Sequence, residues 1–139
     1  MEMEFQKARM QQGFGKVGIL GFAGSGKSYT AHEIARGLHK HIKSKKPVTC
    51  LETENGVDYL IPLYERDTIE IEVAKTRAFA DLIPLINKAE IMSDILVIDS
   101  ATHYWQDIIE SYRNKKNINR LAFQDWAILF RPSRSSLSD

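Results

Sequence analysis

The sequence has few of the residues that mark secreted or membrane proteins. It contains one cysteine, Cys50, and four prolines among 139 residues. A single cysteine cannot form an internal disulfide, and no Cys or His pair has the spacing of a zinc site. No apolar run approaches the roughly 20 residues of a membrane span, and the N-terminus has no signal-peptide pattern. We therefore expect no membrane association, and a reducing cytoplasm fits best.

A large excess of charge of either sign is also missing. The formal net charge is +1, so any affinity for nucleic acid must come from local clusters of cations. Hydrophobic residues make up 43% of the chain and charged residues 27%, which is typical of a folded globular protein. The length allows one small domain with a single core.

Apolar runs and helical patterns alternate along the chain. We expect strands over residues 17–20 and 48–53, around residues 69–73 at a sheet edge, and over residues 95–98, buried on both faces. Helical periodicity follows Lys27 and recurs over residues 79–86, 104–112 and 121–130. This alternation predicts an α/β sandwich with a mainly parallel sheet. We expect an N-terminal helix or arm over residues 1–15, the core over 16–131 and a disordered Ser-rich tail over 132–139.

The segment from Gly21 to Ser28 fits the Walker A pattern, a glycine, four residues and then Gly-Lys-Ser. Its glycines allow backbone N–H groups to surround phosphates, and the following helix offers its positive end to the same anion. Lys27 should reach the β and γ phosphates, and Ser28 should bind magnesium. The predicted nucleotide-binding residues are Gly21, Phe22, Ala23, Gly24, Ser25, Gly26, Lys27, Ser28 and Tyr29.

Acidic residues follow two of the expected strands. Asp99 comes directly after residues 95–98 and is the Walker B candidate that would hold the magnesium shell. Hydrolysis also needs a group that polarises the attacking water, and Ser100 follows Asp99 in place of a glutamate. Glu54 and Glu52, near the end of the second strand, are the alternatives. We favour Glu54 because ligands bind at the carboxyl ends of strands in open α/β sheets.

Four ordered motifs make residues 5–112 resemble the RecA-like ATPases, and more closely a phage-encoded branch of them. These are Phe5-Gln6-Lys7-Ala8; Ala31, Ile34, Ala35, Gly37 and Leu38 after the Walker A segment; Thr53, Glu54 and Gly56; and Asp99, Ser100, His103 and Trp105. The resemblance implies the RecA core, a three-layer P-loop NTPase sandwich that binds ATP with Mg²⁺, with Lys27 and Glu54 as catalytic residues. It also implies a role in DNA recombination or annealing, with single-stranded DNA and further copies of the chain as partners.

The sequence departs from this family at its C-terminal end. RecA-like cores place a strand with a γ-phosphate sensor between the Walker B strand and the Walker A strand. No apolar strand follows Tyr112, so we expect a member that is truncated or altered there, with a gap in the sheet beside the phosphate site. ATP binding is expected to persist, while hydrolysis depends on the missing part.

A polar and basic segment, residues 113–120, is expected to form a loop, and its cations are candidate DNA contacts or a solvated surface: Arg113, Lys115, Lys116 and Arg120. His103 is a candidate for sensing phosphate or orienting Asp99, with a structural histidine as the alternative. A small-molecule kinase and a non-hydrolysing nucleotide-binding module are the competing functions.

Overall fold

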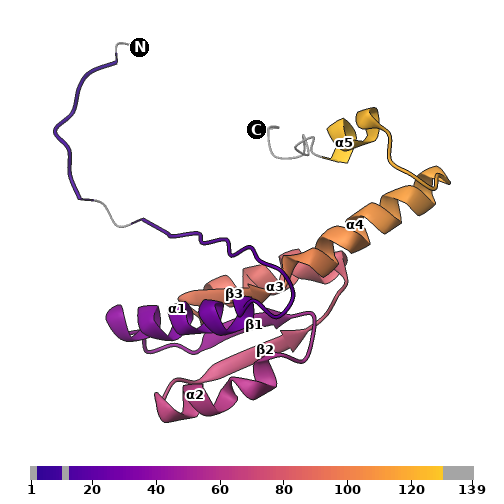
Figure 1. The fold of residues 1–139 in the computed structure, drawn as a ribbon. Helices are drawn as coiled ribbons and strands as arrows, with labels where there is room; N and C mark the ends of the chain where they lie inside the picture. Colours follow the sequence, from indigo (N-terminus) through magenta and orange to yellow (C-terminus); the bar gives the residue numbers. More distant parts are fainter. Residues whose placement is uncertain (1–2, 11–12, 130–139) are drawn as a thin grey trace.

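The computed structural model describes residues 3–10 and 13–129 as an α/β fold with a parallel sheet at its centre (Figure 1). The sheet has three strands in the order β2-β1-β3. In chain order the elements are α1 (Lys27–His41), β1 (Val48–Glu52), η1 (Val57–Tyr59), α2 (Ile61–Arg66), β2 (Ile71–Lys75), α3 (Phe79–Met92), β3 (Ile95–Asp99), α4 (Ala101–Lys116) and α5 (Phe123–Leu129).

The central strand β1 is buried along its whole length and separates two helical layers. Val48 and Cys50 belong to a core cluster with Ala35 of α1 and Tyr64 of α2. The alternate residues of β1 point to the opposite face, where the Thr49 and Ser93 hydroxyls lie 2.7 Å apart at the end of α3. The expected three-layer α/β architecture with a parallel sheet is therefore confirmed for the described residues.

The expected strand over residues 17–20 does not form. Residues 13–20 have no helix or strand, and Val17 and Leu20 are 72% and 99% exposed. A strand exists only when a neighbour accepts its backbone hydrogen bonds, and in the described sheet β3 is the last strand on this side. The prediction that β3 is buried on both faces is also wrong, because Ile98 is 38% exposed. Its position at the edge of the described sheet leaves β3 without a neighbour on one side.

The sequence predicts a helix or arm at the N-terminal end of the chain and a disordered tail at the C-terminal end. Residues 3–10 are exposed and have no helix (Figure 1). The tail over residues 132–139 lies outside the described residues. Within the part of the chain that the structure describes, no helix combines the length and apolar character needed to cross a membrane.

Helix α4 extends beyond the end of the sheet, and α5 follows the far end of α4 (Figure 1). The prediction of a loop over residues 113–120 is wrong at its start, because α4 continues to Lys116. The C-cap residue, Asn117, has a left-handed backbone conformation (φ 53°). Arginine and lysine are good helix formers, and cations are favoured at the negative end of a helix. The last expected helix is confirmed as α5, joined to α4 by a hydrogen bond of 2.8 Å from the Tyr112 hydroxyl to Asp125.

Candidate functional site

The Walker A segment forms an exposed loop that leads directly into α1. Gly24 and Gly26 have φ angles of 76° and 88°, a region that residues with a Cβ rarely adopt. A Cβ on Gly21 would collide with the Ser25 hydroxyl. Gly26, which the pattern requires, and the additional Gly24 therefore stand at positions where this backbone favours glycine.

Helix α1 begins at Lys27 with open hydrogen-bond donors. Gly26 at its N-cap makes no side-chain capping bond, and the first turn contains no acidic residue. The first N–H groups of a helix have no partner within it, and the helix dipole is positive at this end. The Lys27 ammonium donates to the Phe22 carbonyl at 2.8 Å, so it folds back over the loop. These features suit a bound phosphate group.

Asp99 ends β3 on the side of the sheet that α1 covers. Helix α1 packs against both β3 and β1. Within α1, Ser28 and His32 are four residues apart and so share one face. Burial lowers the pKa of His32, and the charge of nearby Asp99 opposes this shift. Ser28 therefore lies one helical turn before His32, the residue of α1 whose pKa is affected by the charge of Asp99.

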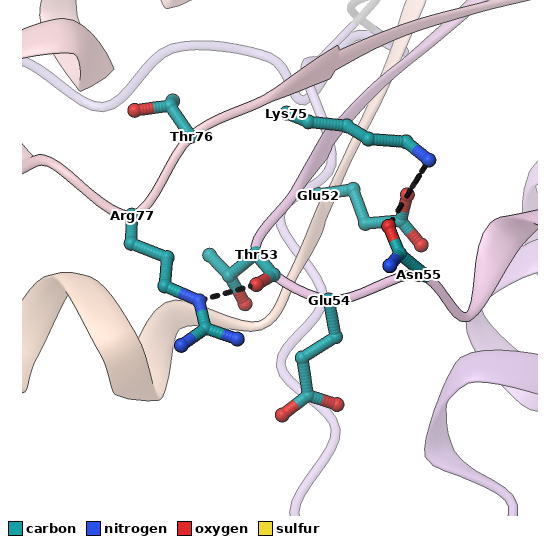
Figure 2. A pocket seen from close by; sticks show the side chains of 7 residues that line it. All are labelled: Glu52, Thr53, Glu54, Asn55, Lys75, Thr76 and Arg77. Carbon is teal, nitrogen blue, oxygen red and sulfur yellow. Dashed lines mark hydrogen bonds and ion pairs between the residues drawn. The ribbon is translucent and has the colours of Figure 1, made fainter.

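The two candidate glutamates have different surroundings. Glu52, the last residue of β1, is buried, and its carboxylate accepts the Val57 backbone N–H at 2.5 Å. Its other oxygen lies 3.7 Å from the Lys75 ammonium. The Glu54 side chain is 69% exposed beyond the strand end, and Figure 2 shows it pointing away from Glu52 and Lys75. Glu52 is thus engaged in holding the turn at η1, while Glu54 is accessible to water and ligand.

Thr53 joins the ends of three chain segments, a role that the sequence analysis did not predict. Its hydroxyl lies 2.7 Å from Nδ1 of His103 and accepts the Ser100 N–H at 3.1 Å. Its carbonyl accepts a hydrogen bond from Nε of Arg77 at 2.8 Å (Figure 2). The only local signal was a polar residue at the carboxyl end of an apolar strand.

A pocket of about 370 Å³ opens between the carboxyl ends of β1 and β2 (Figure 2). It is lined by Glu52, Thr53, Glu54, Asn55, Lys75, Thr76 and Arg77. Lys75, the last residue of β2, and Thr76 and Arg77, which come directly after it, were not among the predicted site residues. The pocket adjoins Glu54 and carries charges of both signs.

The predicted DNA-contacting cations lie away from this region. Arg113, Lys115 and Lys116 occupy the last turn of α4, and Arg120 follows it. The 16 residues of α4 span about 24 Å at 1.5 Å per residue, and Asp99 precedes the opposite end of the helix. The structure therefore groups these cations with each other but does not bring them to the phosphate loop.

No group of three or more potential metal-ligating His, Cys, Asp or Glu side chains occurs within residues 3–10 and 13–129. Magnesium keeps several waters and is usually held by one or two carboxylates together with substrate phosphates. Ser28 and Asp99 remain the candidates for such a site, in which a bound nucleotide would supply the other oxygens.

Comparison with known protein families matches residues 14–128 to the AAA domain. The match includes the phosphate loop, both strand-end carboxylates and most of α5. No curated protein and no solved structure matches the chain. Because the matched stretch covers far more than half of the sequence, the chain belongs to the AAA domain family of P-loop nucleotide-binding ATPases.

Proposed function

We propose that this protein is a magnesium-dependent ATPase of the RecA type that acts on single-stranded DNA in recombination or annealing. The observation that carries the proposal is the open glycine loop at the uncapped N-terminus of α1, with Asp99 and Glu54 at the ends of the neighbouring strands. A triphosphate would receive backbone N–H groups from the loop and the positive end of the helix.

The residues divide into binding and catalytic roles. Lys27 would leave the Phe22 carbonyl for the β and γ phosphates. Ser28 and Asp99 would hold the magnesium ion, which neutralises charge that develops on the phosphates. Glu54, being exposed beside the strand end, would orient and deprotonate the attacking water. Glu52 is the weaker candidate for that role because its carboxylate is buried and bonded to backbone.

A kinase is the second candidate, and the pocket between β1 and β2 is the feature that favours it. The pocket adjoins Glu54 and offers Arg77 and Lys75, two cations that suit an anionic acceptor molecule. A kinase would use the same phosphate loop and transfer the γ-phosphoryl group to that molecule instead of to water.

ATP turnover, measured with and without single-stranded DNA and with a panel of phosphoryl acceptors, separates these functions. Hydrolysis that rises with DNA supports the proposal, and transfer to an acceptor supports the kinase. Binding without either reaction would identify a nucleotide-binding module and contradict the proposal.

Lys27→Ala tests the phosphate loop itself and should abolish binding of a fluorescent ATP analogue while the fold persists. Lys45→Ala is the matched control, because it removes the same charge beyond the far end of α1, which spans about 22 Å. Equal ATP affinity in the two variants would refute the assignment of the loop.

A further inference from the structure

His103, in the first turn of α4, stands between Thr53 and Glu54. Its Nδ1 lies 2.7 Å from the Thr53 hydroxyl oxygen, and its Nε2 lies 3.5 Å from a carboxylate oxygen of Glu54. The His103 side chain is 22% exposed, against 69% for Glu54. The ring is therefore held by its surroundings, while the carboxylate that it faces is not.

Thr53 gives the ring a rigid support. Its backbone N–H donates to the Asp99 carbonyl at 2.9 Å, which ties the end of β1 to the end of β3. Its carbonyl is bonded to Arg77, beyond the end of β2. Thr53 is thus fixed to both neighbouring strands, and a group bonded to its hydroxyl is placed relative to the whole carboxyl edge of the sheet.

The hydrogen bonds indicate which ring nitrogen carries the proton. The Thr53 hydroxyl already accepts the Ser100 N–H at 3.1 Å, and its own proton can go to Nδ1 of His103 at 2.7 Å or to the Asp99 carbonyl at 3.4 Å. The shorter distance favours Nδ1 as the acceptor. A neutral ring then carries its hydrogen on Nε2, which faces the Glu54 carboxylate. The opposite tautomer would direct a lone pair at that carboxylate.

We propose that His103 is a positioning residue that holds the Glu54 carboxylate at the site of water attack. The proposal rests on the proposed ATPase function. Glutamate has several rotatable bonds, and Glu54 lies beyond the end of β1. Within the described residues, His103 is the side chain that places a ring nitrogen within 4 Å of the Glu54 carboxylate. The contact links the residue that activates water to the same strand edge that carries Asp99.

Replacing His103 by alanine is the first test. General-base catalysis contributes about 10²–10⁴-fold, so loss of its positioning should lower kcat for ATP by about tenfold or more. KM for ATP and the affinity for the ATP analogue should stay unchanged, because His103 does not belong to the phosphate loop. A loss of thermal stability without a change in kcat would mean that the residue is structural and would overturn the proposal.

Two conservative variants separate the two contacts of the ring. A glutamine amide reaches about as far as Nε2, so His103→Gln should retain the contact to Glu54 and recover much of the rate. An asparagine amide reaches only about as far as Nδ1, so His103→Asn should keep the bond to Thr53 and remain slow. Rates in the reverse order would contradict the assignment of Nε2 to Glu54.

Combination with Glu54→Gln distinguishes action through Glu54 from an independent effect. His103→Ala should reduce kcat in the wild-type background and cause no further reduction in the Glu54→Gln background. Equal reductions in both backgrounds would overturn the positioning role. Absence of ATP turnover by the wild-type protein would overturn both this role and the ATPase function, whereas wild-type turnover that His103→Ala leaves unchanged overturns the positioning role alone.

Discussion

Replacing Gly26 by alanine tests the backbone geometry of the phosphate loop. Gly26 is the N-cap of α1 and has φ 88° and ψ 21°. A Cβ built there meets no atom within 4 Å, so the cost of the substitution is conformational rather than a collision. Placing a residue with a Cβ in the left-handed region costs roughly 1–2 kcal/mol.

This cost must appear in one of two measurements. If the loop keeps its geometry, the free energy of unfolding falls by about 1–2 kcal/mol, and Tm falls by roughly 3–5 °C for each kcal/mol. If the exposed loop instead relaxes in the free protein, stability is retained and ATP must restore the strained form. ATP affinity then falls by about 5–30-fold, the equivalent of the same free energy.

Gly37→Ala is the matched control in the same helix. Gly37 lies in the interior of α1, and a Cβ there also meets nothing within 4 Å. Alanine should stabilise the fold by about 0.5–1 kcal/mol through its helix propensity, without affecting ATP affinity. Urea denaturation and ATP titration of both variants measure the two quantities. The reasoning is refuted if Gly26→Ala changes neither of them, or if it stabilises the protein as Gly37→Ala should.

Asp99→Asn should weaken ATP binding in the presence of Mg²⁺ but not in its absence, and equal weakening under both conditions would exclude a role in holding the metal. The Lys40 ammonium and the Arg36 guanidinium hold the pKa of Asp67 at about 2. Because this pKa is depressed in the folded state, Asp67 stabilises the protein above about pH 4, and that contribution is lost as the pH falls toward 2. Urea denaturation should therefore show that the free energy of unfolding falls less between pH 7 and pH 3 for Asp67→Asn than for the wild type. An equal fall in both proteins would contradict the ion pairing. If single-stranded DNA binds the end of α4, replacing Lys115 and Lys116 by alanine should make the slope of log affinity against log salt shallower by about 0.7 for each lost phosphate contact, as measured by fluorescence anisotropy. An unchanged slope would move the DNA site elsewhere.

The sequence by itself determined the parts of the molecule that depend on local pattern. The aliphatic run at residues 95–98 and the apolar run from Val48 became β3 and β1. The spacing of glycines and Lys27 specified the phosphate loop, because the positive φ angles of Gly24 and Gly26 are a local demand of the backbone. Asp99 and Glu54 could be chosen as site residues because the carboxyl ends of parallel strands meet at one edge of a sheet.

Tertiary structure decided the features that depend on partners far away in the chain. Residues 17–20 also contain an apolar run typical of a strand, yet they form none, and β3 is the last strand on its side of the described sheet. The Glu52 carboxylate meets the Lys75 ammonium of β2, and His103 meets Thr53 across 50 residues of sequence. These contacts follow from the parallel register that sets Glu52 opposite Lys75 and Asp99. Side-chain periodicity identifies each strand but leaves its alignment with its neighbours open, and that alignment is fixed only when the strands pair and the helices close over them.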